Sequence, residues 1–197
     1  MNSIIFALMT AFTPETPLPS TEQFTAEIER FSDLYAIELQ PGWQVKTASF
    51  DNPSPFLTLA NANNCTIYIN TNSQAQTVWS YLVDHPDIGT EVFTAFAAGH
   101  EVFHCLAAQP GERMRMKGLF EAGLEHSFAS NNQFEEIAGD SLGLSYAGDM
   151  YPHHTIDLTS HIEKIRSQFA SADAEHNSDG YLGEDHALHI VDLVIAP

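Results

Sequence analysis

The feature that most constrains this 197-residue chain is the sequence HEVFH at residues 100–104. It lies within a strongly apolar stretch that we expect to be helical from about Glu91 to Ala108. On a helix, residues i and i+4 lie on one face about 5–6 Å apart, so His100 and His104 can reach one metal ion. Glu101, the residue after the first histidine, is turned about 100° away from it.

This spacing predicts two zinc ligands and a general base. A catalytic zinc ion is held by three protein ligands, and its fourth position is left for water. His100 and His104 would supply two of the ligands, and Glu101 would take a proton from the zinc-bound water. Gly99 leaves room beside the first ligand. The alternative is that both histidines are structural and are satisfied by polar neighbours beside a core helix.

A third ligand must come from elsewhere in the chain. Residues 105–111 (CLAAQPG) lack the glycine and the histidine that complete the metzincin pattern. Residues 135–143 (EEIAGDSLG) place Glu136 and Asp140 four positions apart, on one face of a helix expected from about Gln133 to Tyr146. The alternatives for the third ligand are Glu135 and, in the segment 111–130, Glu121, Glu125 and His126.

An HExxH helix followed by a helix that bears ExxxD resembles the gluzincin zinc metallopeptidases, in particular their thermolysin-like members. The resemblance rests on two short segments. It implies that Glu136 is the third zinc ligand, and that Asp140 orients a zinc-bound histidine, most simply His100, through its second ring nitrogen. It also implies peptide-bond hydrolysis by a zinc-bound water that Glu101 activates. The alternative is a non-catalytic zinc-binding regulatory or interaction protein that retains a peptidase fold.

Peptide hydrolysis passes through a tetrahedral oxyanion, which needs a hydrogen-bond donor besides zinc. The resemblance places such a donor downstream of the helix that carries the third ligand. The sequence does not choose among the candidates there, which are Tyr146, Tyr151, His153, His154 and His161.

The charge balance limits the partners. Lys and Arg total 7 against 26 Asp and Glu, which gives a formal net charge of −19. Such a surface repels phosphate backbones and anionic lipid, so we expect neither nucleic-acid nor membrane binding. It attracts metal cations or basic peptides, and a peptide or protein substrate is the expected partner; adaptation to a salty habitat explains the charge equally well. The sequence gives no prediction of oligomeric state.

Short strand-like segments precede the helices, which favours an α+β domain. The resemblance to the gluzincins implies that residues 1–197 form a single domain of zincin type. We expect residues 1–110 to form an upper lobe with a small mixed sheet and the HExxH helix. Residues 111–197 would form a helical lower lobe that supplies the third ligand. The expected strands are Trp43–Phe50, Phe56–Leu59 and Cys65–Asn70; in zincins, an edge strand placed like the last of these binds extended substrate by strand addition.

Two further features bear on the compartment. Cys65 and Cys105 are too few for a disulfide framework, and we expect buried free thiols, with a single bridge as the alternative. Residues 1–12 are apolar but contain no Lys or Arg and are too short to span a bilayer, so a packed segment of the domain is expected. These features favour a cytoplasmic protein, with secretion or a periplasmic location as the alternative.

Overall fold

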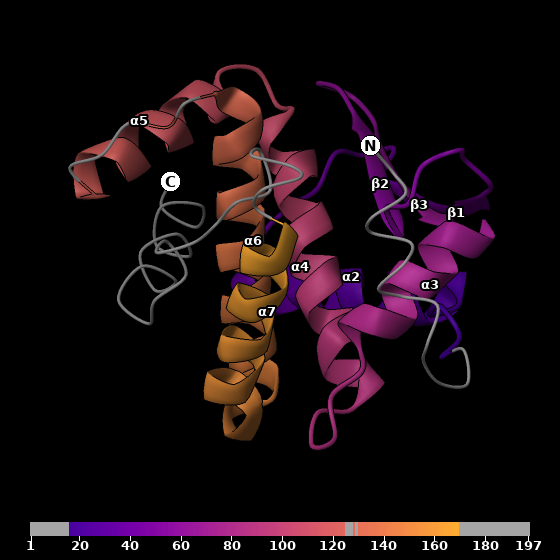
Figure 1. Ribbon diagram of the computed structural model, residues 1–197. Coiled ribbons are helices and arrows are strands. Elements are labelled where there is room, and N and C mark those ends of the chain that lie inside the picture. Colours follow the sequence, from indigo (N-terminus) through magenta and orange to yellow (C-terminus); the bar gives the residue numbers. More distant parts are fainter. Residues whose placement is uncertain (1–15, 125–127, 129, 170–197) are drawn as a thin grey trace.

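The computed structural model describes residues 16–124, 128 and 130–169 (Figure 1). Within these residues the chain forms six α-helices, one short 3-10 helix and a three-stranded mixed sheet. The prediction of an α+β domain with a small mixed sheet is therefore confirmed. The apolar segment 1–12 and residues 170–197 belong to the predicted lobes but lie outside the described residues. No helix in the described part combines the length and the hydropathy that crossing a bilayer requires.

The strands lie between the first helix, α2 (Thr21–Tyr35), and the remaining helices. They are β1 (Gln44–Ala48), β2 (Phe56–Ala60) and β3 (Cys65–Asn70). β3 pairs in parallel with β1 and antiparallel with β2, so the order is β1-β3-β2. The interpretation of Cys65–Asn70 as an edge strand is wrong, because this strand has a hydrogen-bonded partner on each side. Among the described strands, β1 and β2 form the edges.

The helices that follow the sheet agree closely with the periodicity of the sequence, with one exception. The segment 111–130, for which no helix was expected, contains a helix of 13 residues, α5. Its apolar residues do not fall on one face, so hydrophobic periodicity gives no signal for it. The helices after the sheet are α3 (Ser73–Leu82), α4 (Thr90–Ala107), α5 (Glu112–Leu124), α6 (Asn131–Met150), the 3-10 helix η1 (Pro152–His154) and α7 (Thr155–Phe169).

Helices α4 and α6 pack side by side in the centre of the molecule (Figure 1). A Cβ atom on Gly99 would lie 2.9 Å from the Cα of Gly143, and a Cβ on Gly143 would lie 2.4 Å from the carbonyl oxygen of Phe96. Such distances are shorter than packed carbon atoms tolerate, so only glycine at these positions allows the two backbones to approach so closely. The close crossing brings the side chains of His100, Phe103 and His104 against the first half of α6.

The sheet is fixed to α4 by a disulfide bond between Cys65 and Cys105, whose Cα atoms lie 5.5 Å apart. The expectation of two free thiols is therefore wrong, and the alternative of a single bridge holds. Cys65 is the first residue of β3 and Cys105 follows His104 on α4. Two cysteines 40 residues apart in sequence therefore come within bonding distance where the start of β3 meets the last turns of α4.

Candidate metal centre

Three possible metal ligands converge where α4 meets α6. The Nε2 atoms of His100 and His104 lie 3.2 Å apart. The carboxylate of Glu136 approaches both, with 3.6 Å from Oε2 to Nε2 of His100 and 3.7 Å from Oε1 to Nε2 of His104. One donor atom from each residue lies within 4.8 Å of the others, so this group could hold a metal ion.

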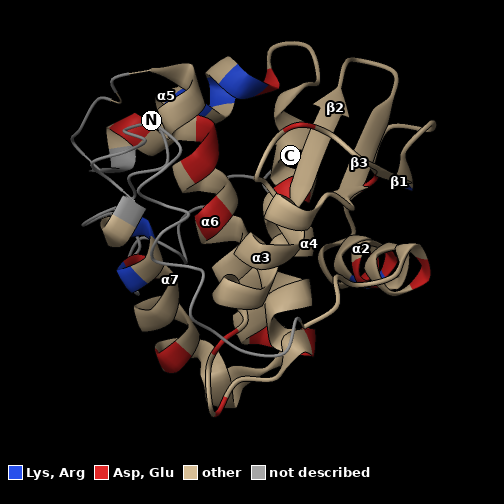
Figure 2. Ribbon diagram, turned by 45° about the vertical axis from the view of Figure 1, so that its right-hand side comes forward, with Lys and Arg blue, Asp and Glu red and all other residues tan. Residues whose placement is uncertain are grey.

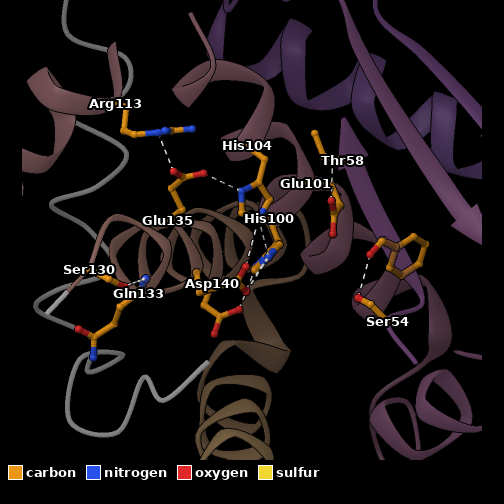
Figure 3. Close-up of polar contacts among 12 residues, drawn as sticks. Ser54, Thr58, His100, Glu101, His104, Arg113, Ser130, Gln133, Glu135 and Asp140 are labelled. Carbon is orange, nitrogen blue, oxygen red and sulfur yellow. Dashed lines mark hydrogen bonds and ion pairs between the residues drawn. The ribbon is translucent and has the colours of Figure 1, made fainter. Parts of the chain in front are cut away.

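The second nitrogen of His100 is held by Asp140, the residue expected to orient it. Nδ1 of His100 lies 2.9 Å from Oδ1 of Asp140, which is fully buried (Figure 3). Arg166 on α7 donates to both oxygens of the same carboxylate, at 2.7 Å from Nε and 2.5 Å from Nη2. Burial alone would raise the pKa of Asp140, but the charge of Arg166 and the contact with His100 lower it. An ionised Asp140 accepts a hydrogen bond from the Nδ1–H group of His100. The Nε2 atom of His100 then carries the lone pair that can bind a metal ion.

The second nitrogen of His104 has a corresponding partner in Glu135. Nδ1 of His104 lies 3.5 Å from Oε2 of Glu135, and Oε1 of Glu135 lies 2.6 Å from Nε of Arg113 on α5 (Figure 3). Burial alone would lower the pKa of His104, whereas the bond to Glu135 and the charges of Glu101 and Glu136 raise it to about 9. Glu135 therefore faces the imidazole from the side opposite to the converging donors, as a partner of His104.

The Nδ1 atom of each imidazole thus faces a carboxylate that forms an ion pair with an arginine. The chain has 7 Lys and Arg, and five of them lie on α5 (Arg113, Arg115, Lys117) and α7 (Lys164, Arg166), the helices that flank α6 (Figure 2). With both Nδ1 atoms directed at carboxylates, the two Nε2 lone pairs and the Glu136 carboxylate face one another. Such a cluster of electron pairs is stable only with a cation among them, either a proton or a metal ion.

Glycine on α6 makes room for the first imidazole. A Cβ atom on Gly139 would lie 3.0 Å from Nδ1 of His100. The ring therefore lies flat against the α6 backbone between Glu136 and Asp140. The space that a side chain at Gly139 would fill is thus taken by the imidazole of His100.

Glu101 points from α4 toward the sheet. Its side chain is buried, and Oε2 accepts a hydrogen bond of 2.6 Å from the hydroxyl of Thr58 on β2 (Figure 3). In the described part of the chain, no group hydrogen-bonds to the other carboxylate oxygen. Thr58 was not predicted as a site residue, nor were Arg113 and Arg166. The rarity of cations offered a weak signal for the two arginines, and nothing in the sequence indicated Thr58.

The candidates for oxyanion stabilisation are not brought to this cluster. Tyr146 lies ten residues, or about 15 Å of helix, beyond Glu136, and its hydroxyl donates to the carboxylate of Glu27 at 2.9 Å. His161 is bonded through Nε2 to the carbonyl of Leu82 at 2.8 Å. The remaining three follow the C-terminus of α6, farther still from Glu136: Tyr151, His153 and His154.

The structure describes one of the three alternative candidates for the third ligand in the segment 111–130. Glu121 on α5 accepts a hydrogen bond of 2.9 Å from the backbone N–H of Phe128 and lies 3.8 Å from Nζ of Lys117. Its contacts are therefore with residues of the segment 111–130 and not with the two histidines. Glu125 and His126 lie outside the described residues. Of the candidates that the structure describes, Glu136 alone reaches both Nε2 atoms.

Comparisons with protein-family models, with curated protein sequences and with solved structures gave no match. The function is therefore inferred from the geometry of the metal centre.

Proposed function

We propose that this chain is a zinc-dependent metallopeptidase of gluzincin type. The observation that carries the proposal is the convergence of two Nε2 atoms and the Glu136 carboxylate. Tetrahedral zinc with bonds of about 2.0–2.1 Å separates its ligand atoms by about 3.3–3.4 Å. The two Nε2 atoms lie 3.2 Å apart, and different oxygens of the Glu136 carboxylate lie 3.6 Å from Nε2 of His100 and 3.7 Å from Nε2 of His104. The donors therefore need only small side-chain adjustments to bind one zinc ion, because their Nδ1 partners already orient both rings.

The roles of the protein groups follow from their positions. Zinc, when bound, polarises the scissile carbonyl and lowers the pKa of the water that attacks it. Glu101 accepts a proton from that water and passes it to the leaving amine. Asp140 and Glu135 hold the imidazoles so that both Nε2 lone pairs remain directed at the ion. These roles support the proposed hydrolysis of a peptide bond.

The finer fold in this proposal is a zincin with two lobes. The sheet and α4 form one lobe, and α5, α6 and α7 form the other, from which Glu136 reaches the histidines. β2 contacts α4 and has one unpaired edge among the described strands. It, and not β3, is the strand suited to bind an extended substrate by strand addition.

A comparison of the wild type with Glu101→Gln tests the proposal. Both proteins should hold one equivalent of zinc, and the variant should cleave a mixed peptide library about 10²–10⁴-fold more slowly, because it has lost its general base. Glu91→Gln, the same substitution on an exposed position of α4, is the matched control and should keep wild-type activity. Equal rates in the wild type and Glu101→Gln would refute the assigned role of Glu101.

One observation favours the second candidate, a non-catalytic zinc-binding protein that acts on a partner. None of the five predicted oxyanion donors lies at the metal cluster. A wild type that binds zinc tightly and cleaves no member of the library would favour this candidate. A wild type that holds no zinc after purification without chelator would favour a third reading, in which the histidines are structural.

A further inference from the structure

The hydroxyl of Thr58 occupies an unusual place in the sheet. Successive side chains of a strand point to opposite faces, so Phe56, Thr58 and Ala60 share one face of β2. Phe56 is buried and stacks on Phe24 of α2, and Ala60 packs against the same core. A polar residue between two core-facing apolar residues is costly unless it has a hydrogen-bond partner.

Glu101 is the partner of Thr58. Thr58 Oγ1 donates to Glu101 Oε2 at 2.6 Å, a length typical of a hydroxyl bound to an ionised carboxylate. Glu101 is itself 7% exposed, so its carboxylate also requires a donor. Across the described residues this is the one hydrogen bond to the carboxylate, and it links the sheet to the residue beside His100 (Figure 3).

We propose that Thr58 is a positioning residue that fixes the rotamer of the general base. The bond holds one carboxylate oxygen at the sheet and leaves the other available for the attacking water. It also connects β2, the strand proposed to bind substrate, with the group that activates the water. Without the hydroxyl, the carboxylate can rotate away from the attack geometry, which proton transfer does not tolerate. This inference rests on the proposed peptidase function.

The test compares Thr58→Val and Thr58→Ser, each loaded with zinc, with the wild type. Valine keeps the shape and β-propensity of threonine without the hydroxyl, whereas serine keeps the hydroxyl. Thr66→Val is the matched control, because Thr66 lies in the same sheet and, among the residues that the structure describes, its hydroxyl bonds only a surface glutamine, Gln44. Zinc content and thermal stability are recorded for all four proteins.

On a peptide that the wild type cleaves, Thr58→Val should lower kcat about 10- to 100-fold and leave KM and zinc content nearly unchanged. Thr58→Ser should restore most of the rate, and Thr66→Val should behave as the wild type. Wild-type kcat in Thr58→Val would overturn the inference. An equal loss in both Thr58 variants would also overturn it, since the loss would then come from packing and not from the hydroxyl.

A second readout does not depend on hydrolysis. Acetohydroxamate chelates zinc and donates a hydrogen bond to a neighbouring carboxylate, so its affinity reports the orientation of Glu101. Calorimetry should show binding to Thr58→Val at least about 10-fold weaker than to the wild type, and Thr58→Ser near the wild type. If the wild type binds hydroxamate but cleaves nothing, the peptidase proposal fails and this titration still decides the role of Thr58. Equal hydroxamate affinity in the wild type and Thr58→Val would overturn the positioning role of Thr58. A wild type that binds no zinc would overturn both this role and the peptidase proposal.

Discussion

Glu135 and Glu136, neighbours on α6, contact opposite nitrogens of one imidazole. Glu136 lies 3.7 Å from Nε2 of His104, on the side where the possible ligands converge, and Glu135 lies 3.5 Å from Nδ1, on the far side. Successive residues of a helix are rotated by about 100°, so two adjacent carboxylates can enclose a ring that lies against the helix. The two glutamates are therefore expected to have different roles, one as a ligand and one as a partner of a ligand.

Metal affinity should separate these roles. Glu136→Ala removes a ligand and should weaken zinc binding by more than about 100-fold, which is the upper end of the effect of losing an outer partner. Glu135→Ala should keep one equivalent of zinc but bind it about 10–100-fold more weakly. Competition with a chelator of known affinity measures both constants. A greater loss of zinc affinity in Glu135→Ala than in Glu136→Ala would show that Glu135, and not Glu136, is the third ligand.

The close crossing of α4 and α6 should be sensitive to a single methyl group. Gly143→Ala places a Cβ 2.4 Å from the Phe96 carbonyl oxygen and should lower the free energy of unfolding by about 1–3 kcal/mol, because the helices must separate. Gly118→Ala on α5 meets no atom within 4 Å and should be neutral or stabilising by up to about 1 kcal/mol. Guanidinium denaturation measures both. Equal stability of the two variants would contradict the packing assigned to Gly143.

The pH dependence of stability follows from His104 in protein stripped of metal by a chelator. Its pKa in the folded chain is about 9, against 6.5 for the free group. A folded-state pKa above the unfolded value means that protonation stabilises the fold. This contribution is complete below pH 6.5 and is lost as the pH rises through about 9. The chelator-treated wild type should therefore lose stability across this window, whereas His104→Gln should not. A loss of the same size in His104→Gln would show that another group titrates.

The Cys65–Cys105 bridge should stabilise the fold chiefly by restricting the unfolded chain. The loop that it closes spans 40 residues, for which the chain-entropy model gives about 4 kcal/mol. Guanidinium denaturation with and without a reductant measures the difference. The double variant Cys65→Ala/Cys105→Ala should match the reduced wild type and should not respond to the reductant. Equal stability of oxidised and reduced wild type would contradict the bridge.

The two helices that carry the candidate ligands were well predicted from the sequence. α4 and α6 were expected within a few residues of their ends, because α4 is a strongly apolar stretch that Pro110 and Gly111 follow, and α6 contains the segment 135–143 with its helical spacing of carboxylates. α5 was missed because its apolar residues do not fall on one face. The interpretation of Cys65–Asn70 as an edge strand was wrong because strand pairing is a long-range property: nothing in this segment shows that it has a neighbour on each side.

Two different arguments anticipated this cluster of possible ligands: the spacing within α4 indicated His100 and His104, and the resemblance to the gluzincins implied Glu136 and Asp140. His100 and His104 share a face of α4, and Glu136 and Asp140 share a face of α6. The residues that support them were not predictable, because Thr58, Arg113 and Arg166 reach the site from other elements. The oxyanion candidates were chosen by sequence order, and the length of α6 carries four of them away from Glu136.

The most direct test of the account is a crystal structure of the chain soaked in zinc, with anomalous diffraction recorded at the zinc edge. We predict one strong peak within about 2.0–2.2 Å of Nε2 of His100, Nε2 of His104 and a carboxylate oxygen of Glu136. An absent peak, or a zinc ion bound elsewhere with Glu136 turned away from the two imidazoles, would contradict the metal centre and the peptidase chemistry proposed for it.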